Sequence, residues 1–207
     1  MTAKTLLLAS QSPRRLQLLL QVAQPLGLCV QTCGFDPSID PESLEAQVPD
    51  ESPKAYVVRV TQNKARAAWT SRVSLGLPLH PLVTGDTTVS LDEEIFGKPR
   101  DEAHAAAMLN RLSGRTHSVY TAVGIHTAAS YQWALSHSSV TFADLPQDWI
   151  HWVIKTGEPF GKAGAYAIQG HAGMMIQSIN GSPSGIMGLP LFETTQLLKA
   201  ALATHHG

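Results

Sequence analysis

Hydrophobic residues near the start of the chain change from a continuous run to a helical stripe. The run Leu6 to Ala9 predicts a buried strand. Ser12 and Pro13 then suit the N-cap and the first position of a helix, and Gly27 suits its end. The apolar stripe between these signals consists of Leu16, Leu19, Leu20 and Ala23. The segment therefore predicts a strand, a tight polar turn and a helix.

The remainder of the chain repeats these two patterns. Strand-like segments are residues 28–33, 81–91, 95–96, 119–125, 131–142 and 174–176, and the segments 119–125 and 131–142 are expected to form an antiparallel hairpin. Helical segments are residues 53–73, 101–114 and 147–156, with a last helix that opens at Pro190. Ser52 and Asp101 are the expected N-caps of the first two of these helices. The acidic, proline-containing residues 37–51 predict a surface loop with weak structure.

Two arginines occupy the first turn of the first predicted helix. The free N–H groups of a helix start favour an anion, whereas the helix dipole disfavours cations such as Arg14 and Arg15 at that position. A phosphate-bearing ligand would explain both arginines. The alternative is a solvated surface pair, and the segment alone leaves both interpretations open.

A carboxylate and a lysine interrupt two apolar patterns. Asp86 lies inside a strand-like run, where an unpaired buried carboxylate would be costly, and Gly85 beside it indicates a bulge or a close backbone approach. Asp86 is therefore a candidate metal ligand or general base, with a hydrogen-bonded turn aspartate as the alternative. Lys64 continues the stripe of Val57 and Val60, so its ammonium either snorkels to solvent or points into a pocket.

Further candidates lie in the turns. The hairpin that ends at Lys98 is expected to bring this residue back toward Asp86. Asp36, at the end of a strand, either holds a metal or caps a turn. Residues 158–190 hold much of the glycine, which indicates backbone wrapped around a ligand, and Lys162, Tyr166 and Gln169 stand out there.

The composition argues against a disordered chain, a nucleic-acid binder with a broad basic face and a membrane protein. The 207 residues are 43% hydrophobic and 15% charged, as expected for a globular chain, and the net charge of −1 argues against a broad basic face for nucleic acid. No apolar run approaches a membrane span or a signal peptide, so no membrane partner is expected and the expected location is the cytoplasm. Cys29 and Cys33 would lie about 13 Å apart on one strand face, too far for a disulfide.

Together the candidates describe a polyphosphate site. Several cations, one well-placed carboxylate and glycine-rich backbone suit such a ligand. With a divalent metal, Asp86 could activate water for attack on a phosphoryl group. The residues collected are Ser12, Arg14, Arg15, Lys64, Asp86, Lys98, Lys162 and Gln169.

Six segments, in order along the chain, carry a resemblance to a known family. They are ASQSPRR, TGDTTV, GKPRD, LSGRTHSVYTAV, EPFGKAGAYAIQG and INGSPSGIMGLP. Over nearly the whole chain the sequence resembles the Maf family of nucleotide pyrophosphatases. The resemblance implies an α/β fold similar to the inosine triphosphatase group, with a mixed central sheet flanked by helices and a cleft between two lobes of a single domain, residues 1–207. It also implies metal-dependent hydrolysis of a nucleoside triphosphate to the monophosphate and pyrophosphate, with magnesium or manganese.

The resemblance extends to individual residues. It implies that Asp86 is the catalytic carboxylate and a metal ligand, and that Lys64 and Lys98 are catalytic lysines of the cleft. Ser12, Arg14 and Arg15 match the phosphate-binding turn, and Lys162 matches another lysine of the cleft. Arg14, Thr87 and Gln169 match positions tied to base selectivity, and GAYAIQG resembles the subgroup that acts on dTTP, UTP and related modified pyrimidine nucleotides. The glutamine amide offers both a donor and an acceptor to the edge of uracil or thymine.

The sequence departs from the family pattern at three places. Thr84-Gly85 stand where Gly-Ala is usual, Gly161 replaces a frequent aspartate before Lys162, and Asp36 belongs to a variant of the usual acidic pair. These departures bear on rate and metal geometry more than on the class of reaction.

Two competing functions remain open at this point. A nucleotide-binding regulator of septum formation without turnover would need the cations but not Asp86. A nucleic-acid-modifying protein is the third hypothesis, and the net charge argues against it. The family often forms homodimers, but the sequence carries no discrete interface signal and leaves the oligomeric state, monomer or homodimer, open.

Overall fold

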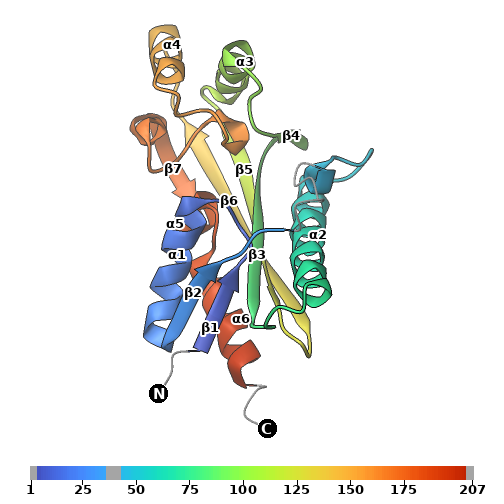
Figure 1. Ribbon diagram of the computed structural model, residues 1–207. Helices are drawn as coiled ribbons and strands as arrows, with labels where there is room; N and C mark the ends of the chain where they lie inside the picture. Colours follow the sequence, from blue (N-terminus) through green and yellow to red (C-terminus); the bar gives the residue numbers. More distant parts are fainter. Residues whose placement is uncertain (1–3, 36–42, 204–207) are drawn as a thin grey trace.

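The computed structural model describes residues 4–35 and 43–203. Asp36, the second predicted metal ligand, lies outside the described residues, together with residues 37–42 of the predicted acidic loop and residues 1–3 and 204–207. The described part has a seven-stranded mixed sheet with helices on both faces (Figure 1). The two lobes predicted for residues 1–207 remain a prediction.

The strands run in the order β2-β1-β3-β5-β6-β7, with β4 also paired to β3. β1 is parallel to β2 and β3, and all other pairs are antiparallel. The strands are β1 (Lys4–Leu8), β2 (Leu28–Thr32), β3 (Leu82–Leu91), β4 (Glu94–Phe96), β5 (Thr116–His126), β6 (Tyr131–Phe142) and β7 (Ile176–Asn180).

The helices cover the sheet unevenly (Figure 1). α2 packs against β3 and β5, whereas α6 packs on β5 and β6 and also touches α1. α3 and α4 pack against each other at the far end of the long strands. The helices are α1 (Pro13–Ala23), α2 (Pro53–Ser74), α3 (Glu102–Leu112), α4 (Gln147–Lys155), α5 (Pro183–Met187) and α6 (Leu191–Ala203), with 3₁₀ turns η1 (Gln24–Leu26), η2 (Ser43–Glu45), η3 (Ala163–Ala165) and η4 (His171–Met175).

Side-chain caps form as the sequence predicts. Ser12 accepts a hydrogen bond from the backbone N–H of Arg15 at the start of α1, and Ser52 and Asp101 do the same for α2 and α3. Each cap satisfies an N–H group that the helix itself leaves unpaired. α1 consequently begins where the chain leaves β1, with its first turn beside the end of that strand.

One edge of β3 is left open in the middle. β5 pairs with β3 along nearly its whole length, so β1 and β4 share the opposite edge. On that edge β1 reaches only Val83 and β4 begins only at Val89, so within the described residues no strand pairs with positions 84–88. This gap separates the two ends of the molecule and exposes β3 to the space between them.

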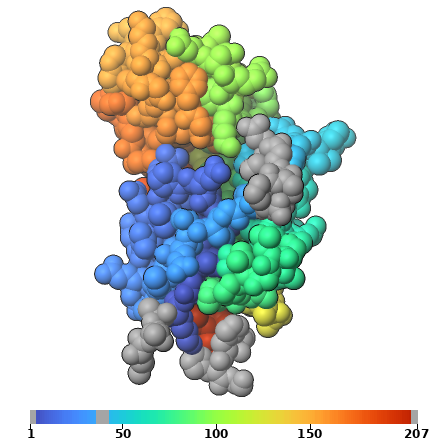
Figure 2. All heavy atoms as spheres, in the orientation of Figure 1, coloured from blue at the N-terminus to red at the C-terminus, as the bar shows by residue number. Residues whose placement is uncertain are grey.

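The two largest clusters of buried side chains lie at the two ends of the molecule, and two smaller ones lie between α2 and the sheet. One large cluster joins α3 and α4 to the distal parts of β3, β5 and β6, with Leu109, Phe142 and Ile150 at its centre. A second joins α1 and α6 to the proximal strands, with Leu19 and Leu198. Figure 2 shows the same two ends in the space-filling view, green and orange residues at one end and blue residues at the other.

Two local predictions are wrong. Leu20 is 46% exposed and Leu18 is buried in its place, so the apolar face of α1 is rotated from the predicted stripe. Met174 and Met175 belong to the 3₁₀ turn η4, and the strand begins only at Ile176. Cys29 and Cys33 are free thiols, as predicted. No helix among residues 4–35 and 43–203 is long and apolar enough to cross a membrane.

Gly164 provides a test of how the loop before η4 is held against β3. Its φ is +69°, and a Cβ there would lie 2.9 Å from Cγ1 of the buried Val89. Gly157 has φ +77° with open space around it. The left-handed conformation alone costs about 1–2 kcal/mol for a residue with a Cβ. We expect Gly164→Ala to lower the free energy of unfolding more than Gly157→Ala in urea titrations, and equal losses would contradict the packing.

Candidate active site

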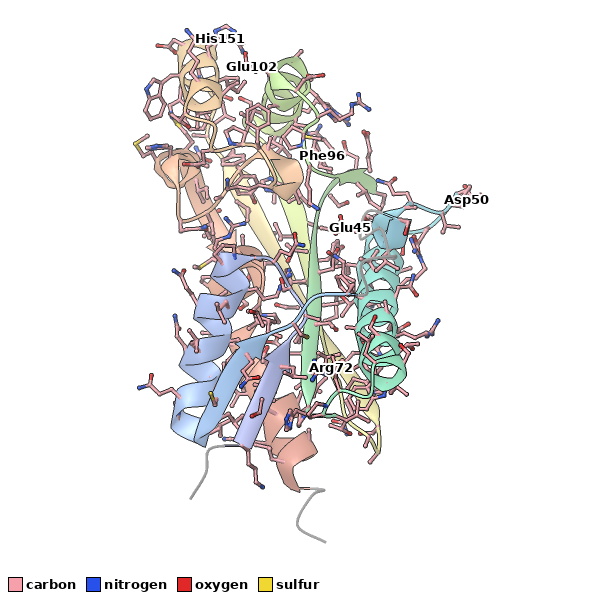
Figure 3. All side chains as sticks on the ribbon, viewed as in Figure 1. Glu45, Asp50, Arg72, Phe96, Glu102 and His151 are labelled. Carbon is pink, nitrogen blue, oxygen red and sulfur yellow. The ribbon has the colours of Figure 1, made fainter. Side chains whose placement is uncertain are left out.

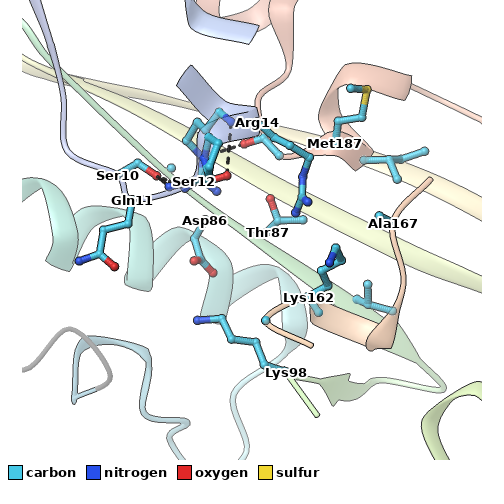
Figure 4. Close-up of a pocket in the computed structure, with 18 of the residues that line it drawn as sticks. Ser10, Gln11, Ser12, Arg14, Asp86, Thr87, Lys98, Lys162, Ala167 and Met187 are labelled. Carbon is cyan, nitrogen blue, oxygen red and sulfur yellow. Dashed lines mark hydrogen bonds between the residues drawn. The ribbon is translucent and has the colours of Figure 1, made fainter. Parts of the chain in front are cut away.

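The open edge of β3 forms the floor of a cleft of about 680 Å³ (Figure 4). Its walls come from the β1–α1 turn, from α5 and the residue after it, and from the loop that contains η3. Successive side chains of a strand point to opposite faces, so Asp86 lies on the α2 side and Thr87 on the α5 side. The cleft therefore presents two chemically different faces, one on each side of β3.

The β1–α1 turn supplies hydroxyl groups. Ser10 Oγ accepts from Ser12 N at 3.1 Å and from Arg15 Nη1 at 2.8 Å, and Ser12 Oγ accepts from Arg15 N at 3.3 Å. Each hydroxyl thus acts as an acceptor within the turn and keeps its own proton for a further bond. Both serines line the cleft, where these protons suit an anion at the helix start.

The two arginines of the first turn have different surroundings. Arg15 Nε donates to the carbonyl of Gly188 at 2.9 Å, so this side chain ties the start of α1 to the residue after α5. Burial lowers the pKa of Arg15, and the nearby Asp86 opposes that shift. Arg14 extends into the cleft beside Thr87 (Figure 4). The solvated surface pair, one of the two sequence-based interpretations, is therefore wrong.

Asp86 belongs to a chain of alternating charges. Lys64 Nζ lies 2.7 Å from Asp86 Oδ1 and 2.7 Å from Glu45 Oε1, and Lys98 Nζ lies 2.9 Å from Glu45 Oε2. Lys64 is only 8% exposed, so the snorkelling alternative is wrong and its ammonium points into the cleft. Lys98 is therefore linked to Asp86 through Glu45 and Lys64, and not by a direct ion pair.

Burial and the neighbouring cations act in opposite directions on the pKa values of these two carboxylates. Burial raises the pKa of Asp86, although Lys64 and Arg15 lower it in part. Glu45 is more open, and there the two lysines outweigh burial and lower the pKa. Figure 3 shows Glu45 near the end of α2 toward the cleft and Arg72 at its opposite end. The site thus contains one carboxylate whose pKa is raised and one whose pKa is lowered.

Two cations face each other on the other side of the cleft. Lys162 Nζ donates to the backbone carbonyls of Glu158 and Phe160, and burial together with the charge of Arg14 lowers its pKa. Two cations held close without an anion between them are unfavourable, and a phosphate group would remove that repulsion. Gln169 is exposed on the rim of the same side.

Tyr166 forms part of the wall. Its hydroxyl and His117 Nε2 lie 2.8 Å apart in a buried hydrogen bond, and Phe142 packs on both rings. Burial lowers the pKa of His117 to about 4, so the ring is neutral at pH 7. The pair fixes the wall and leaves the Tyr166 hydroxyl engaged within the protein.

Gly85 allows a close approach rather than a bulge. The β3–β5 pairing continues through Gly85 without a shift in register, and a Cβ there would lie 2.9 Å from the carbonyl of Ala122. Gly161, another of the three departures from the family pattern, has φ +72°, which favours glycine.

The side-chain oxygens of the cleft fit a cation such as magnesium only when phosphate oxygens of a ligand complete the coordination. Within residues 4–35 and 43–203 no three His, Cys, Asp or Glu side chains gather as a metal site. Asp86 and Glu45, however, converge on the same ammonium and line the cleft together. Magnesium usually takes one or two carboxylates plus substrate phosphates, so these two residues fit such an ion when a polyphosphate is present.

The structure brings most of the predicted site residues into one cleft. Its lining includes Ser12, Arg14, Arg15, Lys64, Asp86, Thr87, Lys98, Lys162 and Gln169. Glu45 is the residue that sequence reasoning missed. It lies in η2, inside the segment predicted as a weak surface loop, and nothing in that acidic run distinguishes it from Glu42 or Glu51.

Solved structures share this architecture. A HAM1 protein from Coxiella burnetii aligns with a TM-score of 0.53 at 13% identity, covering 95% of this chain and 99% of that one. The Ham1 protein of Staphylococcus aureus aligns with a TM-score of 0.52 at 12% identity, covering 98% and 100%. At these identities the likeness shows the fold alone, and it confirms the predicted α/β class.

Sequence comparison identifies the family. A family model described as Maf-like protein matches residues 5–201. A Burkholderia pseudomallei protein named dTTP/UTP pyrophosphatase is 52% identical over 196 residues, covering 94% of this chain and 92% of that protein. A Cupriavidus metallidurans protein of the same name is 52% identical over 196 residues, covering 95% and 96%. The chain belongs to the Maf family.

Removing Lys64 tests the charge chain. In Lys64→Met, Asp86 and Glu45 lose their shared cation, and breaking a buried pair typically costs about 3 kcal/mol or more. The folded pKa of Asp86 is already above its unfolded value and would rise further. Protonation of Asp86 therefore favours the folded state. This contribution to stability is present at low pH and is lost as pH rises through the folded pKa of Asp86.

We accordingly expect the loss of unfolding free energy in Lys64→Met to be larger at pH 8 than at pH 5 in urea titrations. Lys98→Met is the matched control, because the Lys98 side chain is 55% exposed and its pair with Glu45 is partly solvated. A loss in Lys64→Met that is the same at both pH values would rule out the buried charge chain.

Proposed function

We propose that this protein hydrolyses dTTP, UTP and related modified pyrimidine nucleotides to the monophosphate and pyrophosphate. The observation that supports this most directly is the buried Asp86–Lys64 pair at the open edge of β3, in a cleft whose opposite side carries Arg14 and Lys162. The relatives named dTTP/UTP pyrophosphatase support the choice of substrate.

Each side of the cleft has a separate task in this proposal. Ser12, Arg14 and Lys162 bind phosphate oxygens and stabilise the charge that develops on the triphosphate, and Arg15 holds the turn in place through Gly188. Asp86 orients the attacking water and takes its proton, which suits a carboxyl whose pKa is raised. Lys64 and Lys98 keep Asp86 and Glu45 in position. Gln169 and Thr87 contact the nucleoside.

A divalent metal belongs to the proposal as well. When bound, magnesium or manganese would polarise the phosphoryl group and the water, with Asp86 and Glu45 as its protein ligands. Glu45 is the firmer anion of the two, because Lys64 and Lys98 lower its pKa. The chain's own contribution is to hold both carboxylates at the point where the polyphosphate enters.

A nucleotide-binding regulator without turnover is the alternative of another class. It would require Arg14 and Lys162 but would have no use for a buried carboxylate beside the phosphate site. The position of Asp86 on the cleft floor therefore favours hydrolysis.

Asp86→Asn tests the hydrolysis directly. The amide keeps the shape of the side chain but cannot take a proton, and a general base contributes about 10²–10⁴-fold to rate. We expect pyrophosphate release from dTTP and UTP to fall by at least about 10²-fold while nucleotide binding, measured by calorimetry, is retained.

Asp92→Asn is the matched control for this substitution. Asp92 lies in the turn between β3 and β4, with its side chain 67% exposed, and should leave the rate unchanged. Full activity of Asp86→Asn would refute the role of the carboxylate. Binding without any turnover in the unmodified protein would instead favour the regulator.

Metal removal tests the cofactor. We expect excess EDTA to abolish pyrophosphate release and added magnesium or manganese to restore it. Glu45→Gln should shift the magnesium requirement to higher concentrations, since the amide is a weaker ligand. A full rate in EDTA would exclude a divalent metal from the reaction.

A further inference from the structure

The segment that carries Glu45 is held against α2 by side chains of that helix. Tyr56 Oη donates to the backbone carbonyl of Glu45 at 2.9 Å. Arg59 Nη2 donates to the next carbonyl, that of Ala46, also at 2.9 Å. Further along the same helix, Lys64 Nζ lies 2.7 Å from the Glu45 carboxylate. One helix therefore binds both the backbone and the side chain of the acidic residue that sequence reasoning missed.

The guanidinium of Arg59 is itself fixed in position. Its Nε and Nη2 donate to the two carboxylate oxygens of Glu51, each at 2.6 Å, and its Cζ lies 5.6 Å from the centre of the Tyr56 ring. A bidentate pair fixes the orientation of a guanidinium as well as its place, and the second proton of Nη2 remains for Ala46. Arg59 thus joins the two ends of the loop of residues 46–51.

The 3₁₀ turn η2 is held only weakly by its own backbone. It has three residues, and the hydrogen bond from Ala46 N to the carbonyl of Ser43 is 3.5 Å long, well beyond the usual length. Figure 3 shows Glu45 beside the end of α2 and Asp50 in the loop that follows, further from the cleft. The bonds from Tyr56 and Arg59 therefore determine where the backbone of Glu45 lies, and with it the direction of the carboxylate.

We propose that Tyr56 and Arg59 are positioning residues for the divalent cation: they fix the backbone of Glu45 so that its carboxylate stays directed into the cleft, where it binds the metal together with the polyphosphate. The inference rests on the proposed function for the presence of the metal. It adds two residues of α2 that are not part of the cleft lining and act only through Glu45.

A fixed backbone raises the affinity of a carboxylate for a metal for an entropic reason. A ligand residue on a mobile loop must be ordered when the metal binds, and that cost reduces the affinity. Glu45 lies in a short turn and its side chain is 25% exposed, so its order has to come from its neighbours. Tyr56 and Arg59 provide this order before any ligand enters, because both donate to backbone carbonyls and leave the carboxylate oxygens free of their own bonds.

The test measures binding, so it does not depend on turnover. Dissociation constants of the non-hydrolysable α,β-imido analogue of UTP are measured by calorimetry in magnesium and in EDTA, and their ratio gives the enhancement of binding by magnesium. The affinity of the nucleotide itself for magnesium is the same for every variant.

Two variants and one matched control are compared with the unmodified protein. Tyr56→Phe removes one hydroxyl and keeps the buried ring, and Arg59→Met removes the guanidinium. Arg111→Met is the control, because Arg111 forms the same bidentate pair with Glu94, at 2.6 and 2.7 Å, and lies over the ring of Phe96, outside the cleft lining.

We expect Tyr56→Phe and Arg59→Met each to reduce the magnesium enhancement by about tenfold, the usual effect of losing a residue that orients a metal ligand. The dissociation constant in EDTA should stay within about twofold, and Arg111→Met should change neither value. An unchanged enhancement in either variant would overturn the proposal. Equal weakening in magnesium and in EDTA, which a purely structural role predicts, would also overturn it. Should Arg59→Met not fold, Tyr56→Phe makes the same comparison.

A double variant tests whether Tyr56 acts through Glu45. In a Glu45→Gln background, Tyr56→Phe should cause no further fall in the enhancement, because both substitutions remove the same metal contact. A further tenfold fall would contradict the proposal.

The same measurements separate this inference from the proposed function. An enhancement that Glu45→Gln leaves unchanged would refute Glu45 as a metal ligand, and this inference with it. An enhancement that falls in Glu45→Gln but not in Tyr56→Phe would overturn this inference alone. Absence of hydrolysis would affect the proposed function only, because all of these ratios come from binding.

Discussion

The structure depends on keeping a carboxylate at the open edge of a buried strand. Asp86 is 9% exposed, and desolvation of a carboxylate is costly unless a cation and hydrogen bonds compensate. Lys64 provides that compensation from α2, and Glu45 and Lys98 extend it to the loops on either side. The helix, the strand and the two loops around the cleft are thus joined by one set of charges, and any ligand that enters must compete with it.

The charged groups lie where strand pairing along one edge of β3 is interrupted, at positions 84–88. If β1 continued along β3, the edge would be closed and positions 84–88 would be ordinary interior residues. Because β1 stops and the chain turns into α1, the start of a helix and the open strand edge meet at the same point. A helix start favours anions and the strand edge carries a carboxylate, so phosphate chemistry and proton transfer are brought together. The alternation of side chains along β3 then separates them, with Asp86 facing α2 and Thr87 facing α5.

Much of this was accessible from the sequence where the signal was local. The caps at Ser12, Ser52 and Asp101 and the hairpin of residues 119–125 and 131–142 depend on neighbouring residues, and the structure confirms them. The orientation of Lys64 was not accessible, because an apolar stripe does not show whether a long side chain at its end meets solvent or a carboxylate. Leu20 was misassigned for a related reason: several leucines in α1 fit a helical period, and only the neighbouring α6 and β2 decide which of them is buried.

The sequence by itself determined the order of the elements, the helix caps and the set of residue types that suit a polyphosphate, since these depend on short-range periodicity and on side-chain chemistry. Only the tertiary structure decided which acidic residue completes the site, because Glu45 is chosen by its distance to Lys64 and Lys98 and not by its neighbours in sequence. That distance is set by the packing of η2 against α2, which no local sequence pattern contains.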